Sequence, residues 1–277
     1  MSESAPSIAS ALRQARALGL ETLDAQLLLL HALDRPASAR AWLAAHGDEA
    51  LAPVAAARFR ACVERRLAQE PLAYIVGRRE FYGLNLHVDQ RVLIPRADTE
   101  TLVDWALQLL REKRGARLID LGTGSGAIAL ALKHQRTDLQ VSALDASAQA
   151  LDLARENARH LRLDVHFTQG HWLDGIEEKF DLIASNPPYV RTGDPHLLAL
   201  HAEPEQALVA GLDGLADLRQ IIVAAPACLN PGGWLLLEHG YDQAESVRAL
   251  LQDAGLSEVV SRRDLAGIAR CSGGRLD

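Results

Sequence analysis

Cysteine is scarce in this sequence, which contains only Cys62, Cys228 and Cys271 among 277 residues. The three are far apart, odd in number and never in Cys-x-x-Cys spacing, so they predict neither a disulfide framework nor a zinc site. The histidines have no metal-ligand spacing either. We therefore expect reduced thiols and no bound metal ion.

Long apolar runs are also missing. Runs such as residues 27–30 are far shorter than the roughly 20 residues that a membrane-spanning helix needs. Residues 1–7 are polar and place no basic residue ahead of an apolar stretch, unlike a secretory signal peptide. We expect a cytoplasmic protein that makes no membrane contact.

An excess of basic residues is the third absence. The net charge is −7, with +1 over residues 1–85 and −8 over residues 86–277. A protein that grips a nucleic-acid backbone usually has a basic face or domain. We expect no direct nucleic-acid binding. With 48% hydrophobic and 23% charged residues, the composition is that of an ordinary soluble globular protein.

What is present changes in character along the chain. Residues 1–75 are rich in Ala, Leu, Arg and Gln, with apolar residues three and four apart, which predicts about four short helices in a small domain. Residues 76–98 contain two apolar stretches around Gly83 and a turn at Asp89, which predicts a β-hairpin linker. Residues 99–277 form the third part.

In this third part, short apolar runs alternate with amphipathic segments. Such alternation predicts an α/β fold around a mostly parallel sheet. Strands are expected at 117–121, 140–144, 165–167, 181–184, 234–238 and 257–262. Helices are expected at 99–110, 127–134, 148–160, 216–228 and 243–254.

A glycine-rich turn follows the first of these strands. Its residues are Asp120, Leu121, Gly122, Thr123, Gly124, Ser125 and Gly126. Glycines let the backbone approach a ligand closely, and the helix that follows offers free N–H groups. Asp145, at the end of the next strand, is placed to accept hydrogen bonds from ribose hydroxyls. The context indicates an adenosine-containing cofactor; a ligand-free turn and NAD are the alternatives at this point.

A second motif, Asn186-Pro187-Pro188-Tyr189, follows the strand at 181–184. Two prolines fix the turn and remove two backbone donors. Asn186 supplies a side-chain acceptor, Pro187 a carbonyl acceptor and Tyr189 an aromatic face. Two acceptors can hold both hydrogens of a planar NH₂ group and turn its lone pair toward an electrophilic methyl group. The alternative is a proline-stiffened turn that happens to begin with Asn.

Both motifs together resemble those of class I methyltransferases that use S-adenosylmethionine on amino or amide nitrogens. Segments 77–83 and 93–100, Glu203-Pro204 and 237–240 resemble the bacterial release-factor glutamine methyltransferases, the PrmC/HemK family. This resemblance covers nearly the whole chain. It implies a Rossmann-like, mostly parallel seven-stranded sheet with a helical N-terminal domain that docks the substrate.

The resemblance also implies roles for individual residues. It implies methyl transfer from S-adenosyl-L-methionine to the glutamine of the Gly-Gly-Gln loop in peptide chain release factors. The cofactor contacts would come from Asp120, Gly122, Thr123, Gly124, Ser125, Gly126, Asp145, Trp172 and Asn186. The substrate contacts would come from Asn186, Pro187, Pro188, Tyr189 and Arg96, with Asn186, Pro187 and Tyr189 as the catalytic set.

Some features favour plainer interpretations. His171, His201 and His239 are expected to be structural, because the reaction needs no general base. Trp172 could simply belong to the core, and Arg96 could lie on a solvated helix start. The family usually has an acidic residue before Arg270 and an apolar strand after it. Because Ala269 and a Cys-Ser-Gly run stand there instead, we expect a weak or frayed last strand, away from both motifs.

Three rival functions share parts of this pattern. A glutamine methyltransferase acting on a ribosomal protein would carry the same two motifs. A DNA adenine or cytosine methyltransferase would need a target-recognition segment and a charged path for phosphates, which the sequence lacks. A cofactor-binding regulatory module would not need Asn186-Pro187-Pro188-Tyr189. We expect an enzyme that acts as a monomer.

Overall fold

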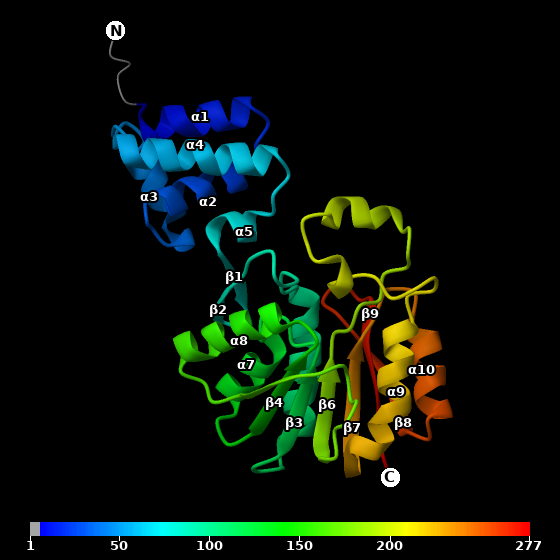
Figure 1. Ribbon diagram of the computed structural model, residues 1–277. Coiled ribbons are helices and arrows are strands. Elements are labelled where there is room, and N and C mark those ends of the chain that lie inside the picture. The colour runs from blue at the N-terminus through cyan, green and yellow to red at the C-terminus, as the bar shows by residue number, and fades with distance from the viewer. Residues whose placement is uncertain (1–5) are drawn as a thin grey trace. The chain divides into compact units, whose positions relative to one another are not determined.

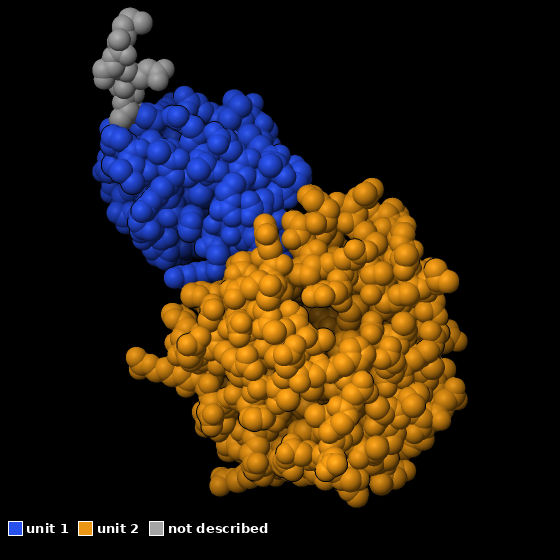
Figure 2. All heavy atoms as spheres, viewed as in Figure 1, with its two compact units in different colours: residues 1–78 blue, residues 79–277 orange. Residues whose placement is uncertain are grey.

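The structure is a computed structural model that describes residues 6–277. The chain divides into two compact units, Met1–Arg78 and Arg79–Asp277. Figure 2 colours them separately. No helix among the described residues is both long and apolar enough to cross a membrane.

The first unit is all-helical. Its elements are α1 (Ile8–Ala17), α2 (Thr22–Ala32), η1 (Ala37–Ala39), α3 (Arg40–Ala45), α4 (Pro53–Leu67) and α5 (Leu72–Val76). The sequence predicted about four helices here, and the structure has one α-helix more. Pro71 is the N-cap of this further short helix, which ends at Gly77 in a left-handed conformation. Apolar faces of α1, α2 and α4 form a separate core around Leu28, Leu29 and Phe59.

A short hairpin begins the second part of the chain. Strands β1 (Arg78–Phe81) and β2 (Leu84–His87) pair across the two-residue turn Tyr82-Gly83. Both turn residues have positive φ, at 50° and 78°, which matches the twist of a tight two-residue hairpin. Phe81, Leu84 and Leu86 are buried in the core of the larger unit.

The larger unit is built on a seven-stranded sheet in the order β5-β4-β3-β6-β7-β9-β8. Its strands are β3 (Arg117–Leu121), β4 (Gln140–Asp145), β5 (His166–Gln169), β6 (Phe180–Ser185), β7 (Leu229–Glu238), β8 (Ser257–Arg263) and β9 (Ala269–Arg275). The first five pair in parallel, while β9 runs antiparallel to both β7 and β8. The α/β class and the mostly parallel sheet are confirmed.

Helices cover both faces of this sheet (Figure 1). One face carries η2 (Ala97–Thr99), α6 (Glu100–Leu109), α7 (Ala127–Gln135) and α8 (Ala148–Leu161). The other carries α9 (Ala216–Cys228) and α10 (Ala244–Asp253). Residues alternate along the strands, so Leu118 packs on the first face and Ile119 on the second. Between β6 and α9, the chain forms the short helices η3 (Pro195–Leu200) and η4 (Glu205–Ala207).

The expected weak last strand is wrong. β9 is seven residues long and lies inside the sheet, with Cys271, Ser272 and Gly273 buried. Small residues suit this position, since a Cβ on Gly273 would come within 2.6 Å of the Leu235 carbonyl oxygen. Nor is β9 remote from the second motif, because Cys271 pairs in register with Glu238, which contacts Tyr189.

Candidate active site

A cavity of about 300 Å³ opens where β3, β4 and β6 end. Its position follows the rule that ligands bind beyond the carboxyl ends of parallel strands. Figure 2 shows that the surface of the larger unit is hollowed on the visible face. Eight of the predicted site residues line the cavity: Gly122, Thr123, Gly124, Ser125, Asp145, Trp172, Asn186 and Pro188.

The glycine-rich turn needs its glycines for backbone geometry and for packing. Gly122 has φ +67°, and a Cβ there would lie 3.1 Å from the Trp172 ring. Gly126 has φ +86° and caps α7, where a Cβ would lie 2.9 Å from Leu130. The turn therefore lies closely between the Trp172 ring on one side and α7 on the other.

Asp120 lies beneath this turn and is wholly buried. Its Oδ2 accepts hydrogen bonds from Thr123 Oγ1 at 2.6 Å and from the Ala129 N–H at 3.2 Å. Within residues 6–277, its Oδ1 has no partner. Burial raises the Asp120 pKa to about 7. A buried oxygen without a partner is rare in proteins, and this one can accept from a ligand amine.

Asp145 holds the turn from the neighbouring strand. The Gly124 N–H donates to its Oδ2 at 2.8 Å, and the Ser147 N–H donates to its Oδ1 at 2.9 Å. Burial raises the pKa of Asp145, while these two backbone donors lower it. Each carboxylate oxygen keeps a further lone pair, so Asp145 can still accept from two ribose hydroxyls.

Trp172 forms one wall of the cavity. Its indole Nε1–H donates to Asp217 Oδ1 at 3.1 Å, and Asp217 lies in the first turn of α9. Its backbone φ is +47°, which is uncommon for a residue with a side chain. The hydrogen bond and the contact with Gly122 fix the ring. Trp172 lines the cavity and also packs against the core on that face of the sheet.

Asn186 shows a second unpaired acceptor. Its Nδ2 donates to Thr99 Oγ1 at 3.3 Å, whereas its Oδ1 is buried and has no partner among the described residues. Asn186 lines the same cavity as Asp145. A buried acceptor beside a cavity that lacks a donor can bind an N–H group of a substrate.

Tyr189 lies outside the cavity lining but is firmly held. Its hydroxyl donates to Glu238 Oε1 at 3.3 Å, and its carbonyl oxygen accepts from Gln243 Nε2 at 3.0 Å. Gly214 packs against the same carbonyl, where a Cβ would come within 2.3 Å. Burial raises the pKa of Tyr189, so the phenol stays neutral and donates.

Five predicted residues do not line the cavity: Asp120, Gly126, Pro187, Tyr189 and Arg96. Arg96 forms an ion pair with Glu203, whose second oxygen accepts from the Ile94 N–H at 3.0 Å. This ion pair therefore links the segment before α6 to the loop that follows the second motif.

The three histidines differ in position. His239 is wholly buried between the Gly240 carbonyl and the Ser272 hydroxyl, and His201 is exposed. His171 lines the cavity beside Trp172, although the sequence assigned it only a structural role. Among the residues that the structure describes, no group of three or more potential ligands could hold a metal ion.

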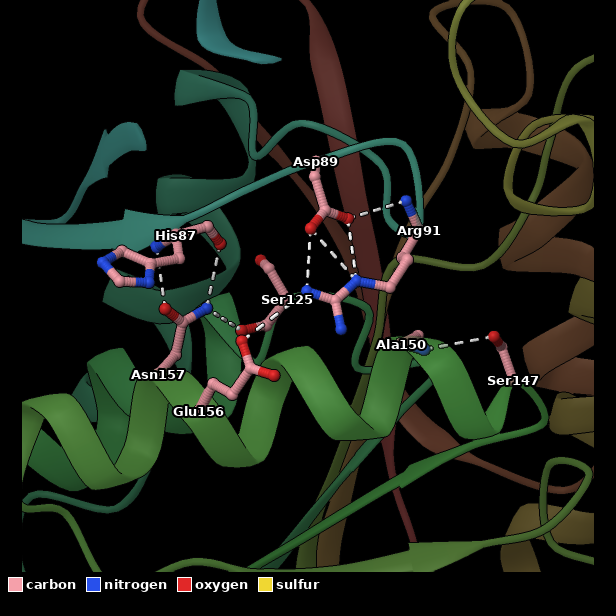
Figure 3. A network of polar contacts seen from close by, with 8 residues as sticks. All are labelled: His87, Asp89, Arg91, Ser125, Ser147, Ala150, Glu156 and Asn157. Atoms are coloured by element: carbon pink, nitrogen blue, oxygen red, sulfur yellow. Dashed lines mark hydrogen bonds and ion pairs between the residues drawn. The ribbon is translucent and has the colours of Figure 1, made fainter. Parts of the chain in front are cut away.

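Sequence reasoning missed Asn157, which joins three segments (Figure 3). Its Oδ1 accepts from the His87 N–H at 2.7 Å, and its Nδ2 donates to the carbonyls of His87 at 3.0 Å and Ser125 at 2.9 Å. Nearby, Arg91 pairs with Asp89 and Glu156 and also lines the cavity. The hairpin, α8 and the glycine-rich turn are thus linked by one buried amide.

Thr99, Glu238, Gln243 and Asp217 were not among the predicted site residues. Thr99 and Glu238 do lie in two of the segments that carry the family resemblance, 93–100 and 237–240, and Glu238 is also an acidic residue at the end of the apolar run 235–237. Its carboxyl group is 1% exposed, and burial raises its pKa to about 7.

Comparison with known families matches both parts of the chain. Residues 7–77 match the family described as "PrmC N-terminal domain", and residues 99–211 match "Methyltransferase small domain". A crystal structure of a methyltransferase from Pyrococcus furiosus aligns with a TM-score of 0.52 and 20% identity, over 76% of this chain and 95% of that one. That likeness supports the fold alone.

Curated relatives match along almost the whole chain. The "Release factor glutamine methyltransferase" of Xylella fastidiosa (strain Temecula1) is 51% identical over 92% of this chain and 94% of its own length. The protein of the same description from Burkholderia pseudomallei is 46% identical over 100% of this chain and 99% of its own length. With both of its parts matched and two full-length relatives this similar, the chain belongs to the release factor glutamine methyltransferase family.

Proposed function

We propose that this enzyme transfers a methyl group from S-adenosyl-L-methionine to the side-chain amide nitrogen of the glutamine in the Gly-Gly-Gln motif of peptide chain release factors. The observation that carries the proposal is the unpaired Oδ1 of Asn186 in a cavity shared with Asp145. Family membership supports the same substrate, because both full-length relatives are described as acting on release factors.

The residues in and beneath the cavity fit this cofactor. Asp120, beneath the glycine-rich turn, has an unpaired buried oxygen for the methionine amine, and Asp145 has lone pairs for the ribose hydroxyls. Trp172 provides an aromatic wall for the adenine, and Gly122 to Gly126 provide a turn without bulky side chains. When bound, S-adenosylmethionine supplies a methyl group on a positively charged sulfur.

The acceptor nitrogen is a poor nucleophile, since its lone pair is delocalised into the amide carbonyl. Asn186 Oδ1 accepts one of its hydrogens, and the Pro187 carbonyl accepts the other. These two hydrogen bonds turn the lone pair toward the methyl group, so the residues contribute mainly by positioning. The aromatic ring of Tyr189 packs beside the flat amide group.

No strong base acts before the methyl group moves. Asn186 and Pro187 would hold the nitrogen, and the bound cofactor would supply the methyl group, its sulfur keeping the electron pair of the C–S bond as the new C–N bond forms. The nitrogen then carries a positive charge and is far more acidic, so its extra proton passes to solvent. Asn186 thus acts as an acceptor that orients the nitrogen, and its amide side chain takes up no proton.

The wider setting follows from the same proposal. The helical unit docks the release factor, and the enzyme acts as a cytoplasmic monomer that binds no nucleic acid directly. The net charge of −8 over residues 86–277 supports the last point, because phosphate binding usually needs a basic surface.

Methyl transfer from labelled cofactor tests the proposal. The enzyme is incubated with a release factor, with the same factor carrying Gln→Ala in the Gly-Gly-Gln loop, and with ribosomal proteins. We expect label on the unmodified release factor alone. Equal labelling of the Gln→Ala factor would overturn the glutamine assignment, and preferential labelling of a ribosomal protein would overturn the choice of substrate.

A further inference from the structure

Resting on the proposed function, we propose that Gln243 and Glu238 are positioning residues that hold Tyr189 at both of its ends, and thereby fix the second motif for the substrate amide. Both lie in residues 238–243, which run from the last residue of β7 to the N-cap of α10. Strand β7 pairs in parallel with β6. The segment that follows β7 and the motif that follows β6 therefore leave the same edge of the sheet as neighbours.

Gln243 binds the main-chain end of Tyr189. Its Nε2 donates to the Tyr189 carbonyl oxygen at 3.0 Å and to the Gly214 carbonyl oxygen at 3.2 Å. Its Oε1 accepts from the Gly240 N–H at 2.8 Å, so both ends of the amide are used and its orientation is set. The side chain is 5% exposed, and a Cβ on Gly214 would come within 2.7 Å of Nε2. These contacts leave the Tyr189 carbonyl no room to move.

The side chain of Gln243 does not serve its own helix. An N-cap side chain usually accepts a hydrogen bond from an N–H group in the first turn of the helix that it begins. Within the described chain, Gln243 makes no such bond to α10. Its amide binds the second motif and the turn at Gly214 instead, so capping of α10 does not account for it.

Glu238 binds the other end of Tyr189. The tyrosine hydroxyl donates to Glu238 Oε1 at 3.3 Å, and Glu238 is only 1% exposed. A hydrogen bond at the hydroxyl limits rotation of the ring, and a hydrogen bond at the carbonyl limits rotation of the backbone. Because both partners belong to residues 238–243, one short segment fixes the backbone and the ring of Tyr189 together.

The two prolines extend this fixed position to the rest of the motif. Their rings fix φ, so the backbone between Asn186 and Tyr189 has few dihedrals left to turn. At the other end, Ser185 is the last residue of β6 and is held in the sheet. Holding Tyr189 therefore places the Pro187 carbonyl, which accepts one hydrogen of the substrate amide in the proposed mechanism.

Gln243→Glu tests the main-chain end. The substitution keeps Oε1 for the Gly240 N–H but replaces the donor Nε2 by an oxygen that faces carbonyl oxygens. We expect kcat on the release factor to fall at least about ten-fold, with the cofactor Kd within about two-fold, because the second motif shifts while the glycine-rich turn stays in place. Gln252→Glu, an exposed position on α10, is the matched control and should leave kcat unchanged.

A double-mutant cycle at the hydroxyl end separates positioning from a purely structural role. Tyr189→Phe removes the hydroxyl, and Glu238→Leu removes its acceptor. If Glu238 acts through the hydroxyl, each single variant lowers kcat by about three- to ten-fold, the effect of one hydrogen bond, and the double variant loses no more than either one. A purely structural role of Glu238 would give losses that multiply.

Multiplying losses in the cycle, or an unchanged kcat in Gln243→Glu, would overturn the positioning roles. If a variant in one of the two experiments does not fold, the other experiment decides alone. A wild-type enzyme that leaves the release factor unmethylated would instead overturn the proposed function.

Discussion

Single residues define this site by the partners that they lack. Asp120 Oδ1 and Asn186 Oδ1 are buried acceptors without a donor in the part of the chain that the structure describes. A buried acceptor normally costs about 1–3 kcal/mol when it has no hydrogen bond. Both lie where β3 and β6 end, so a cofactor amine and a substrate amide would relieve this cost. The two oxygens of Asp145 already accept from two backbone N–H groups, and these hydrogen bonds also organise the glycine-rich turn.

Replacing Asp145 should weaken cofactor binding. In Asp145→Ala the ribose loses its acceptors and Gly124 loses its partner, so we expect the cofactor Kd to rise about 10- to 100-fold. Calorimetric titration with the cofactor measures this directly. Asp152→Ala removes an exposed acid on α8 and serves as the control, with an expected Kd unchanged. Similar affinities in both variants would contradict the role of Asp145.

At the scale of elements, the site depends on connections that no local pattern encodes. The sequence predicted β3, α7 and β4 almost to the residue, because burial and helical periodicity are strong there. It failed for β9, since Ala269 to Gly274 lack the apolar residues that usually mark a strand inside a sheet. That strand forms because small residues fit between β7 and β8, which only the packing reveals.

The site, too, could be predicted from the sequence only where its residues follow a local pattern. Both motifs are contiguous, so the sequence supplied Gly122 and Asn186 as candidates, and Asp145 followed from its place at the end of the next strand. Thr99 and Glu238 reach Asn186 and Tyr189 across separations of 87 and 49 residues, and such pairs cannot be inferred from one sequence. Arg96, a charged residue proposed for the substrate, forms an ion pair with Glu203, which is another pairing that the sequence could not predict.

Asn157 connects elements, and its removal should affect two properties together. Asn157→Ala removes the hydrogen bonds that Asn157 makes to the His87 N–H and to the carbonyls of His87 and Ser125. We expect the free energy of unfolding to fall by about 2–4 kcal/mol and the cofactor affinity to fall as the glycine-rich turn loosens. Urea unfolding and calorimetry measure the two effects. The control is Asn85→Ala, an exposed asparagine on β2, and equal stability in the two variants would refute the link.

Gly214 supports the second motif from behind. In Gly214→Ala, the new Cβ would approach the Tyr189 carbonyl oxygen to 2.3 Å, and φ is +72°. A left-handed alanine alone costs roughly 1 kcal/mol of stability. We expect Gly214→Ala to lower turnover as well, because the new Cβ clashes with the Tyr189 carbonyl oxygen. Gly193→Ala is the matched control, since φ is +79° there but nothing lies within 4 Å of the Cβ. Equal turnover in both variants would show that Gly214 does not position Tyr189.

At the scale of the whole molecule, two buried acids link stability to pH. Burial raises the pKa of Asp120 and of Glu238 to about 7, above their usual values of 3.8 and 4.5. The folded protein therefore binds more protons than the unfolded chain between about pH 4 and 7. Each group adds stability that is full at low pH and is lost as pH rises through about 7.

Glu238→Gln isolates one of these contributions. The difference in unfolding free energy between wild type and Glu238→Gln should shift by about 1–3 kcal/mol in favour of wild type between pH 8 and pH 5. Urea unfolding of both proteins at several pH values measures it. The difference curve cancels the opposing effect of His239, whose pKa is lowered by burial. A flat difference curve would mean that Glu238 titrates as an exposed acid does.

In the proposed mechanism, Asn186 orients the acceptor amide and takes no proton. Single-turnover methyl transfer to a release factor by wild type and Asn186→Ala tests this role, with the cofactor Kd measured on the same samples. Loss of one positioned hydrogen bond predicts a rate at least about 100-fold lower, while the cofactor still binds. An unchanged transfer rate in an Asn186→Ala enzyme that binds the cofactor would contradict the account.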